Sequence, residues 1–81
     1  MNIYKLTITL NSGDVVHMMH DSVINKVQSV SAVLTSLEPE KYFRGYQHNE
    51  ESGNDIEVCV RAGAIAFFTI EQIKKAESTE V

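Results

Sequence analysis

Apolar and polar side chains alternate strictly at the start of the chain, where every second residue from Tyr4 to Leu10 is apolar and lysine or threonine lies between. A period of two is typical of a strand that buries one face. Residues 11–14, Asn-Ser-Gly-Asp, predict a turn. Residues 15–20, Val-Val-His-Met-Met-His, then predict a returning strand that is apolar on both faces. The alternative is a long helix that begins at Asp14, and we prefer the strand.

Apolar residues then recur at intervals of four, three, four and three, which places them on one stripe of a helix. The residues of this stripe are Val23, Val27, Val30, Leu34 and Leu37. Asp21 and Ser22 predict its start, because a short oxygen-bearing side chain can accept a bond from a free amide of the first turn. Pro39 predicts its end, because proline disfavours helical backbone at the preceding residue. We expect this helix to pack on the chain's own sheet, and pairing of two such helices is the alternative.

Residues 40–55 show no regular period, and this stretch exceeds the length of an ordinary connection. We therefore expect an irregular loop, whose polar and acidic part from residue 47 onward is mobile. Residues 42–46 differ, because they hold three of the six aromatic residues around an arginine. These side chains are Tyr42, Phe43, Arg44 and Tyr46. They either fold back over an open edge of the core or form an interface, where aromatic residues and arginine are enriched.

The most apolar stretch lies near the C-terminal end of the chain. Residues 56–61 alternate, which predicts a strand with one buried face. Residues 62–63, Ala-Gly, predict the turn of a hairpin, because glycine reaches positive φ without steric cost. Residues 64–70 are apolar on both faces, with Ile65 and Phe67 on the second face. That pattern requires cover on both sides of the strand.

These patterns predict an α+β fold of order β-β-α-β-β, with a single antiparallel sheet and one helix packed on one face. Residues 1–73 form one small domain, residues 40–55 are its irregular loop, and residues 74–81 are a frayed C-terminal tail. One helix covers only one side of such a sheet. The apolar residues that we expect on the other side are Val15, Met19, Ile65 and Phe67.

Three things could cover this second side: residues 42–46, a second copy of the chain, or a different protein. A two-fold dimer is the commonest arrangement among soluble oligomers. We therefore predict a homodimer that forms sheet to sheet or edge to edge.

Charge and cysteine content narrow the class of protein. Seven basic residues against eleven acidic ones give a net charge of −4, and the basic residues are scattered. We therefore expect no direct contact with nucleic acid. Cys59 is the single cysteine, which excludes an internal disulfide and favours the reducing cytoplasm. No apolar run approaches the roughly 18 residues that span a bilayer, so we expect no membrane partner.

Few residues offer catalytic or metal-binding chemistry. His17 and His20 flank two methionines, and imidazole with thioether suits soft metal ions. On a strand these histidines point to opposite faces, whereas on a helix they lie side by side. Cys59 has only Arg61 as a basic neighbour along the strand, so we interpret it as a packed residue rather than a nucleophile. With no phosphate-binding, hydrolase or zinc motif, we expect no enzyme activity, no cofactor and no metal site.

We therefore expect a non-enzymatic, homodimeric protein-interaction module, which could also take a heterologous protein partner. The main alternative is an inhibitor that presents carboxylates to a basic groove in place of nucleic-acid phosphates. Its acidic residues would be Glu50, Glu51, Asp55 and Glu57. A small metal-binding protein that uses His17 and His20 is the third hypothesis. The order of elements is similar to that of many small proteins of bacteria and their phages, so a phage or plasmid origin fits, but this similarity implies no activity.

Overall fold

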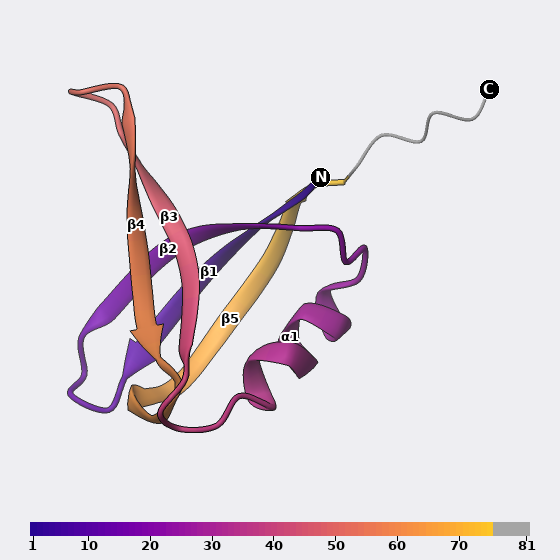
Figure 1. Cartoon of the computed structure of the whole chain (residues 1–81), viewed down its shortest axis with the longest axis vertical. Coiled ribbons are helices and arrows are strands. Elements are labelled where there is room, and N and C mark those ends of the chain that lie inside the picture. The colour runs from indigo at the N-terminus through magenta and orange to yellow at the C-terminus, as the bar shows by residue number, and fades with distance from the viewer. Residues whose placement is uncertain (76–81) are drawn as a thin grey trace.

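A computed structural model describes residues 1–75 as one antiparallel sheet with one α-helix (Figure 1). Its elements are β1 (Asn2–Leu10), β2 (Val15–Ser22), α1 (Val27–Thr35), β3 (Tyr42–Asn49), β4 (Asn54–Arg61), the 3-10 turn η1 (Ala62–Ala64) and β5 (Ile65–Lys74). The strand order is β4-β3-β2-β1-β5, and all neighbouring pairs are antiparallel. The α+β class with a single antiparallel sheet is confirmed. The expected elements occur in the expected order, and one further strand is present.

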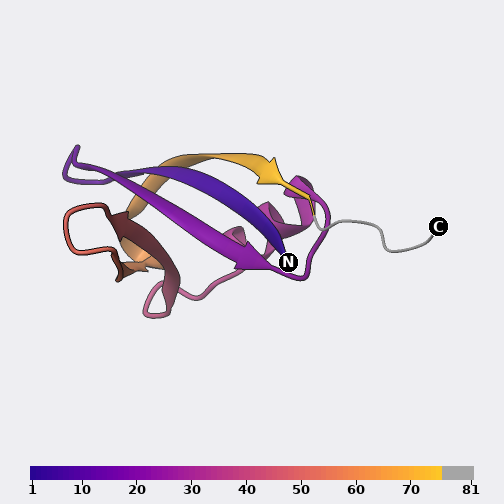
Figure 2. The same cartoon turned by 90° about the horizontal axis from the view of Figure 1, so that it is seen from above.

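The core lies inside the curl of the sheet. Seen from above, β5 curves along one side of the molecule, and the helix is seen between β5 and the diagonal strand β2 (Figure 2). One side chain in two along β1 points into this space, as the alternation in the sequence predicts. The fully enclosed apolar side chains are Tyr4, Leu6, Ile8, Met18, Val30, Leu34, Phe43 and Val60.

Residues 15–20 belong to β2, so the strand interpretation is confirmed and the long helix from Asp14 is wrong. The predicted helix start is also wrong, because Asp21 and Ser22 continue β2, where Asp21 lies opposite Ile3 of β1. Lys26 precedes the first helical residue, and no side chain caps the helix there. Val23 is 81% exposed and takes no part in the buried stripe.

The predicted irregular loop at residues 40–55 is wrong over most of its length, because it contains β3 and the start of β4. Phe43 enters the core, but the next position on the same face is Gly45. A glycine contributes no apolar side chain, so the sequence of β3 shows no alternation of apolar and polar residues that would predict a strand. The close approach of β2 requires that glycine, since a Cβ at Gly45 would lie within 3.0 Å of the Met19 carbonyl oxygen.

The predicted hairpin at residues 62–63 does not form. Instead, η1 carries the chain from β4 at one edge of the sheet to β5 at the other. The Ala62 amide donates to the Lys41 carbonyl and the Gly63 amide to the Pro39 carbonyl, both at 2.8–2.9 Å. These bonds tie the turn to the segment that leads into β3, and β5 then pairs with β1.

A β-bulge also changes which side chains of β5 share a face. Thr9 lies opposite Phe67 and Leu10 opposite Ile65, so Ala66 is an extra residue in the ladder. Ile65 is therefore half-buried against the core rather than on the second face, whereas Phe67 remains exposed. The strand ends at Lys74, one residue beyond the predicted domain, and the predicted tail from residue 76 onward lies outside the described residues.

Candidate interaction surface

The outer face of the sheet is mostly polar. Where β2, β1 and β5 run side by side, Lys5 lies between Met19 and Glu71, and Thr7 lies between His17 and Thr69. The next row, at the end of β1, has Thr9 between two exposed apolar residues. These are Val15, which is 52% exposed, and Phe67, which is 60% exposed. Residues 1–75 therefore present no continuous apolar layer on this face on which a second sheet could stack.

Residues 42–46, one of the three candidates for covering the second side of the sheet, are themselves part of the sheet as the start of β3. Phe43 is buried and lies 4.6 Å from the ring of His20. Tyr46 is half-buried opposite Met19, and its hydroxyl donates to Asp21 Oδ1 at 2.9 Å. Tyr42 and Arg44 are exposed. Because alternate residues of a strand point to opposite faces, Tyr42, Arg44 and Tyr46 share one face of β3, and Phe43 points to the other face, into the core.

A small hollow of about 200 Å³ lies between β2 and β3, which are joined by the Met19–Tyr46 pair. His17, Gln47 and His48 also line it. The Gln47 side chain donates to the His17 carbonyl at 2.6 Å. Burial, and then the bond to Asp21, raise the pKa of the Tyr46 hydroxyl, so this phenol is held as a proton donor.

The residues with metal or nucleophile chemistry lie apart from one another. His17 contacts Thr7 on the outer face, whereas His20 lies with Phe43 on the core side, so this pair cannot chelate one ion. Cys59 is exposed on β4, opposite Arg44. Among residues 1–75, no three His, Cys, Asp or Glu side chains gather closely enough to hold a metal ion. In the same part of the chain, no helix is long and apolar enough to cross a bilayer.

The two edges of the sheet differ in charge. β4, at one edge, carries Asp55, Glu57 and Arg61. Asp55 lies 3.0 Å from the Nδ1 atom of His48 on β3. β5, at the other edge, begins with six uncharged residues, Ile-Ala-Phe-Phe-Thr-Ile. Charged side chains on edge strands discourage pairing with other chains, and the first half of β5 lacks this protection.

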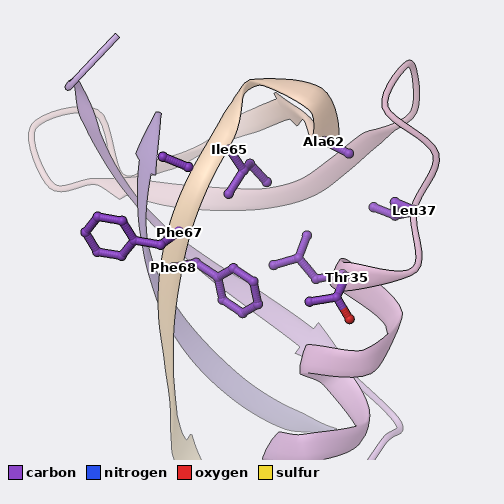
Figure 3. Close-up of a pocket in the computed structure, with 8 residues that line it drawn as sticks. Thr35, Leu37, Ala62, Ile65, Phe67 and Phe68 are labelled. Carbon is purple, nitrogen blue, oxygen red and sulfur yellow. The ribbon is translucent and has the colours of Figure 1, made fainter. Parts of the chain in front are cut away.

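An apolar groove of about 260 Å³ runs beside this unprotected part of β5 (Figure 3). Leu34, Thr35 and Leu37 form the wall at the C-terminal end of α1. Phe68 projects toward that wall, whereas Phe67 projects to the opposite side of the strand (Figure 3). Strand edge and groove together give β5 accessible apolar surface on two sides.

Ile73 belongs to the same strand and was not among the predicted interface residues. It is 46% exposed, and the odd-numbered residues from 67 to 73 are all exposed. If residues 70–73, Ile-Glu-Gln-Ile, continue the strand, Ile70 and Ile73 point to opposite faces, and this is the signal in the sequence that exposes Ile73. The strand therefore carries an exposed apolar side chain near each end, Phe67 and Ile73.

No protein-family model matches the chain, and neither a curated protein nor a solved structure shows significant similarity to it. The functional conclusion therefore rests on the surface of the molecule.

Proposed function

We propose that this chain is a non-enzymatic protein-interaction module that acts in the cytoplasm as a homodimer, joined through the free edge of β5. The observation that carries the proposal is the edge itself, an uncharged run of six residues with Phe67 60% exposed. An exposed hydrophobic edge strand presents unpaired amide and carbonyl groups together with apolar side chains, and it readily accepts another strand.

The distribution of apolar surface supports pairing at the edge over stacking of two sheets. Met19 and Ile65 are half-buried within the chain, and Thr9 separates Val15 from Phe67 on the outer face. The exposed single thiol of Cys59 is in keeping with a reducing compartment.

Sedimentation velocity over a range of micromolar concentrations tests this function. The natural chain should sediment increasingly as a dimer as concentration rises. Phe67→Lys should give a monomer at the same concentrations, because it places a charge at the edge. Val15→Lys is the matched control, since Val15 is also exposed by more than half on the same face but lies on β2, away from the edge. A natural chain that stays monomeric throughout would disprove the proposal. If Val15→Lys also dissociated the dimer, the interface would lie on the outer face of the sheet rather than at the β5 edge.

A further inference from the structure

Between its two register shifts against β1, at Ala66 and at Ile73, β5 alternates its side chains regularly between its two faces. This alternation restricts how a second strand can pair with it. Residues 67, 69, 71 and 73 are exposed, whereas residues 68, 70 and 72 are half-buried. In an antiparallel pair, residues directly opposite each other point to the same face of the sheet. A partner strand must therefore present its own exposed residues opposite the exposed residues of β5.

For two copies of β5 this rule fixes the symmetry axis at a residue rather than between two residues. Opposite residues must both be odd or both be even in number, so their sum is even. For a strand that spans Ile65–Lys74, axes at Thr69 and at Ile70 give the longest overlap. An axis at Ile70 pairs residues 66–74 of one copy with residues 74–66 of the other.

The two axes differ in what they place opposite Phe67. With the axis at Thr69, the phenylalanine faces the partner's Glu71, which is an unfavourable apolar-to-charged pair. With the axis at Ile70, it faces the partner's Ile73, and the symmetry repeats this contact at the other end. Apolar cross-strand pairs of aromatic and β-branched residues stabilise sheets. Both exposed apolar side chains of the strand are then covered.

The charges of β5 fit the same arrangement. With the axis at Ile70, Glu71 faces the partner's Thr69 and Lys74 faces the partner's Ala66, so no two like charges lie directly opposite each other. Glu71 also has Lys5 of its own chain opposite on β1. The β4 edge carries Asp55 and Glu57 in its first half and Arg61 at its end, so it offers no uncharged run of the length found in β5.

We propose, on the basis of the homodimer proposed above, that the occupant of the β5 edge is a second copy of this chain, antiparallel about a two-fold axis at Ile70, with Phe67 against the partner's Ile73. Pairing β5 with β4 of another copy would leave a free edge at each end and continue into a filament, whereas β5 with β5 closes the assembly. A single pair of strands buries less than the roughly 1,600 Å² of an ordinary stable interface, so this dimer dissociates on dilution.

Disulfide trapping measures the position of the axis. In a Cys59→Ser background, Thr69→Cys and Glu71→Cys are made in separate chains, one of them enlarged by a tag, so that Phe67 and Ile73 remain. With the axis at Ile70, Thr69 lies directly opposite the partner's Glu71, at a separation that a disulfide can bridge. Two Thr69 residues are then diagonal neighbours about 7–8 Å apart, which is too far for a disulfide. The mixed dimer should therefore form in large excess over either self-linked dimer in a glutathione buffer.

The outcomes separate this inference from the function on which it rests. Dominant self-linking of Thr69→Cys would place the axis at Thr69 and overturn the register. A sedimenting dimer without cross-links in any mixture would overturn the β5 pairing and leave a homodimer through another surface. A chain that stays monomeric in sedimentation overturns both the proposed function and the inference.

Discussion

Substituting Gly45 with alanine tests the contact that joins the two halves of the sheet. β2 and β3 are linked through the Met19–Tyr46 pair, and Gly45 is the neighbour of Tyr46. An added Cβ would lie within 3.0 Å of both the Met19 carbonyl oxygen and the Met18 sulfur. The sulfur lies on a flexible side chain and can move. The carbonyl belongs to the backbone of a central strand that β1 holds on its other side, so it cannot.

The expected loss combines two opposing effects. Overpacking a buried contact costs about 1–3 kcal/mol, and more when backbone rather than side chain must give way. Replacing glycine within a strand restores about 0.5–1 kcal/mol, because the unfolded chain has less freedom to lose. We expect a net loss of about 2 kcal/mol in the free energy of unfolding. For a domain of this size that corresponds to a fall in Tm of about 8–16 °C.

Thermal and urea unfolding followed by circular dichroism measure this loss, and Gly53→Ala is the matched control. Gly53 has a φ of 75° and open space around the position that a Cβ would occupy. Gly45 does not have a positive φ, so its substitution tests the clash alone. The control therefore measures backbone strain without a clash, at a cost of about 1 kcal/mol. Hydrogen exchange of Gly45→Ala should also speed up in β3 and β4 before β1. A Tm for Gly45→Ala equal to or above that of the control would refute the close approach of β2 and β3.

Two further predictions concern tyrosines. Tyr4→Phe should lower the free energy of unfolding by about 1–2 kcal/mol in urea titrations, because it removes the bond that the buried hydroxyl donates to the Ile24 carbonyl at 2.6 Å. An unchanged midpoint would contradict this bond. Tyr46→Phe should remove a phenol whose pKa is raised, first by burial and then by its bond to Asp21. Since the folded state favours the protonated phenol, its stabilisation is present below the ordinary tyrosine pKa and is lost as pH rises through the raised one. The difference in tyrosinate absorbance between the natural and variant chains should show a midpoint above the ordinary value, and a midpoint at or below it would count against the bond.

The sequence predicted those elements whose pattern agrees with their surroundings. β1 alternates without exception, and its core-facing residues Tyr4, Leu6 and Ile8 are all fully buried. Val30 and Leu34 of the predicted helical stripe are buried as well. Propensity could not place the start of the helix, because the pairing of Asp21 with Ile3 extends β2 through the capping residues. The start of the helix therefore depends on a contact between two strands, which the sequence around residues 21–22 does not reveal.

The residues of the proposed interface were harder to predict, because the topology differs from the one that the sequence suggests. Residues 56–61 and 64–70 adjoin in sequence, yet they occupy opposite edges of the sheet. The Ala-Gly turn between them reads like a hairpin, but its amides bond to residues that precede β3. Nothing local distinguishes a turn that reverses a strand from one that crosses between edges of a curled sheet.

This topology changes the meaning of the apolar residues in β5. A strand that is apolar on both faces would need a second layer, and a second layer implies a partner with a complementary face. The bulge at Ala66 instead turns Ile65 toward the core, so Phe67 and Ile73 are left at the rim of the sheet. At an edge, apolar side chains lie beside unpaired amide and carbonyl groups. A partner that satisfies both kinds of group must itself be a strand, and for this reason we propose pairing at the edge rather than stacking of sheets.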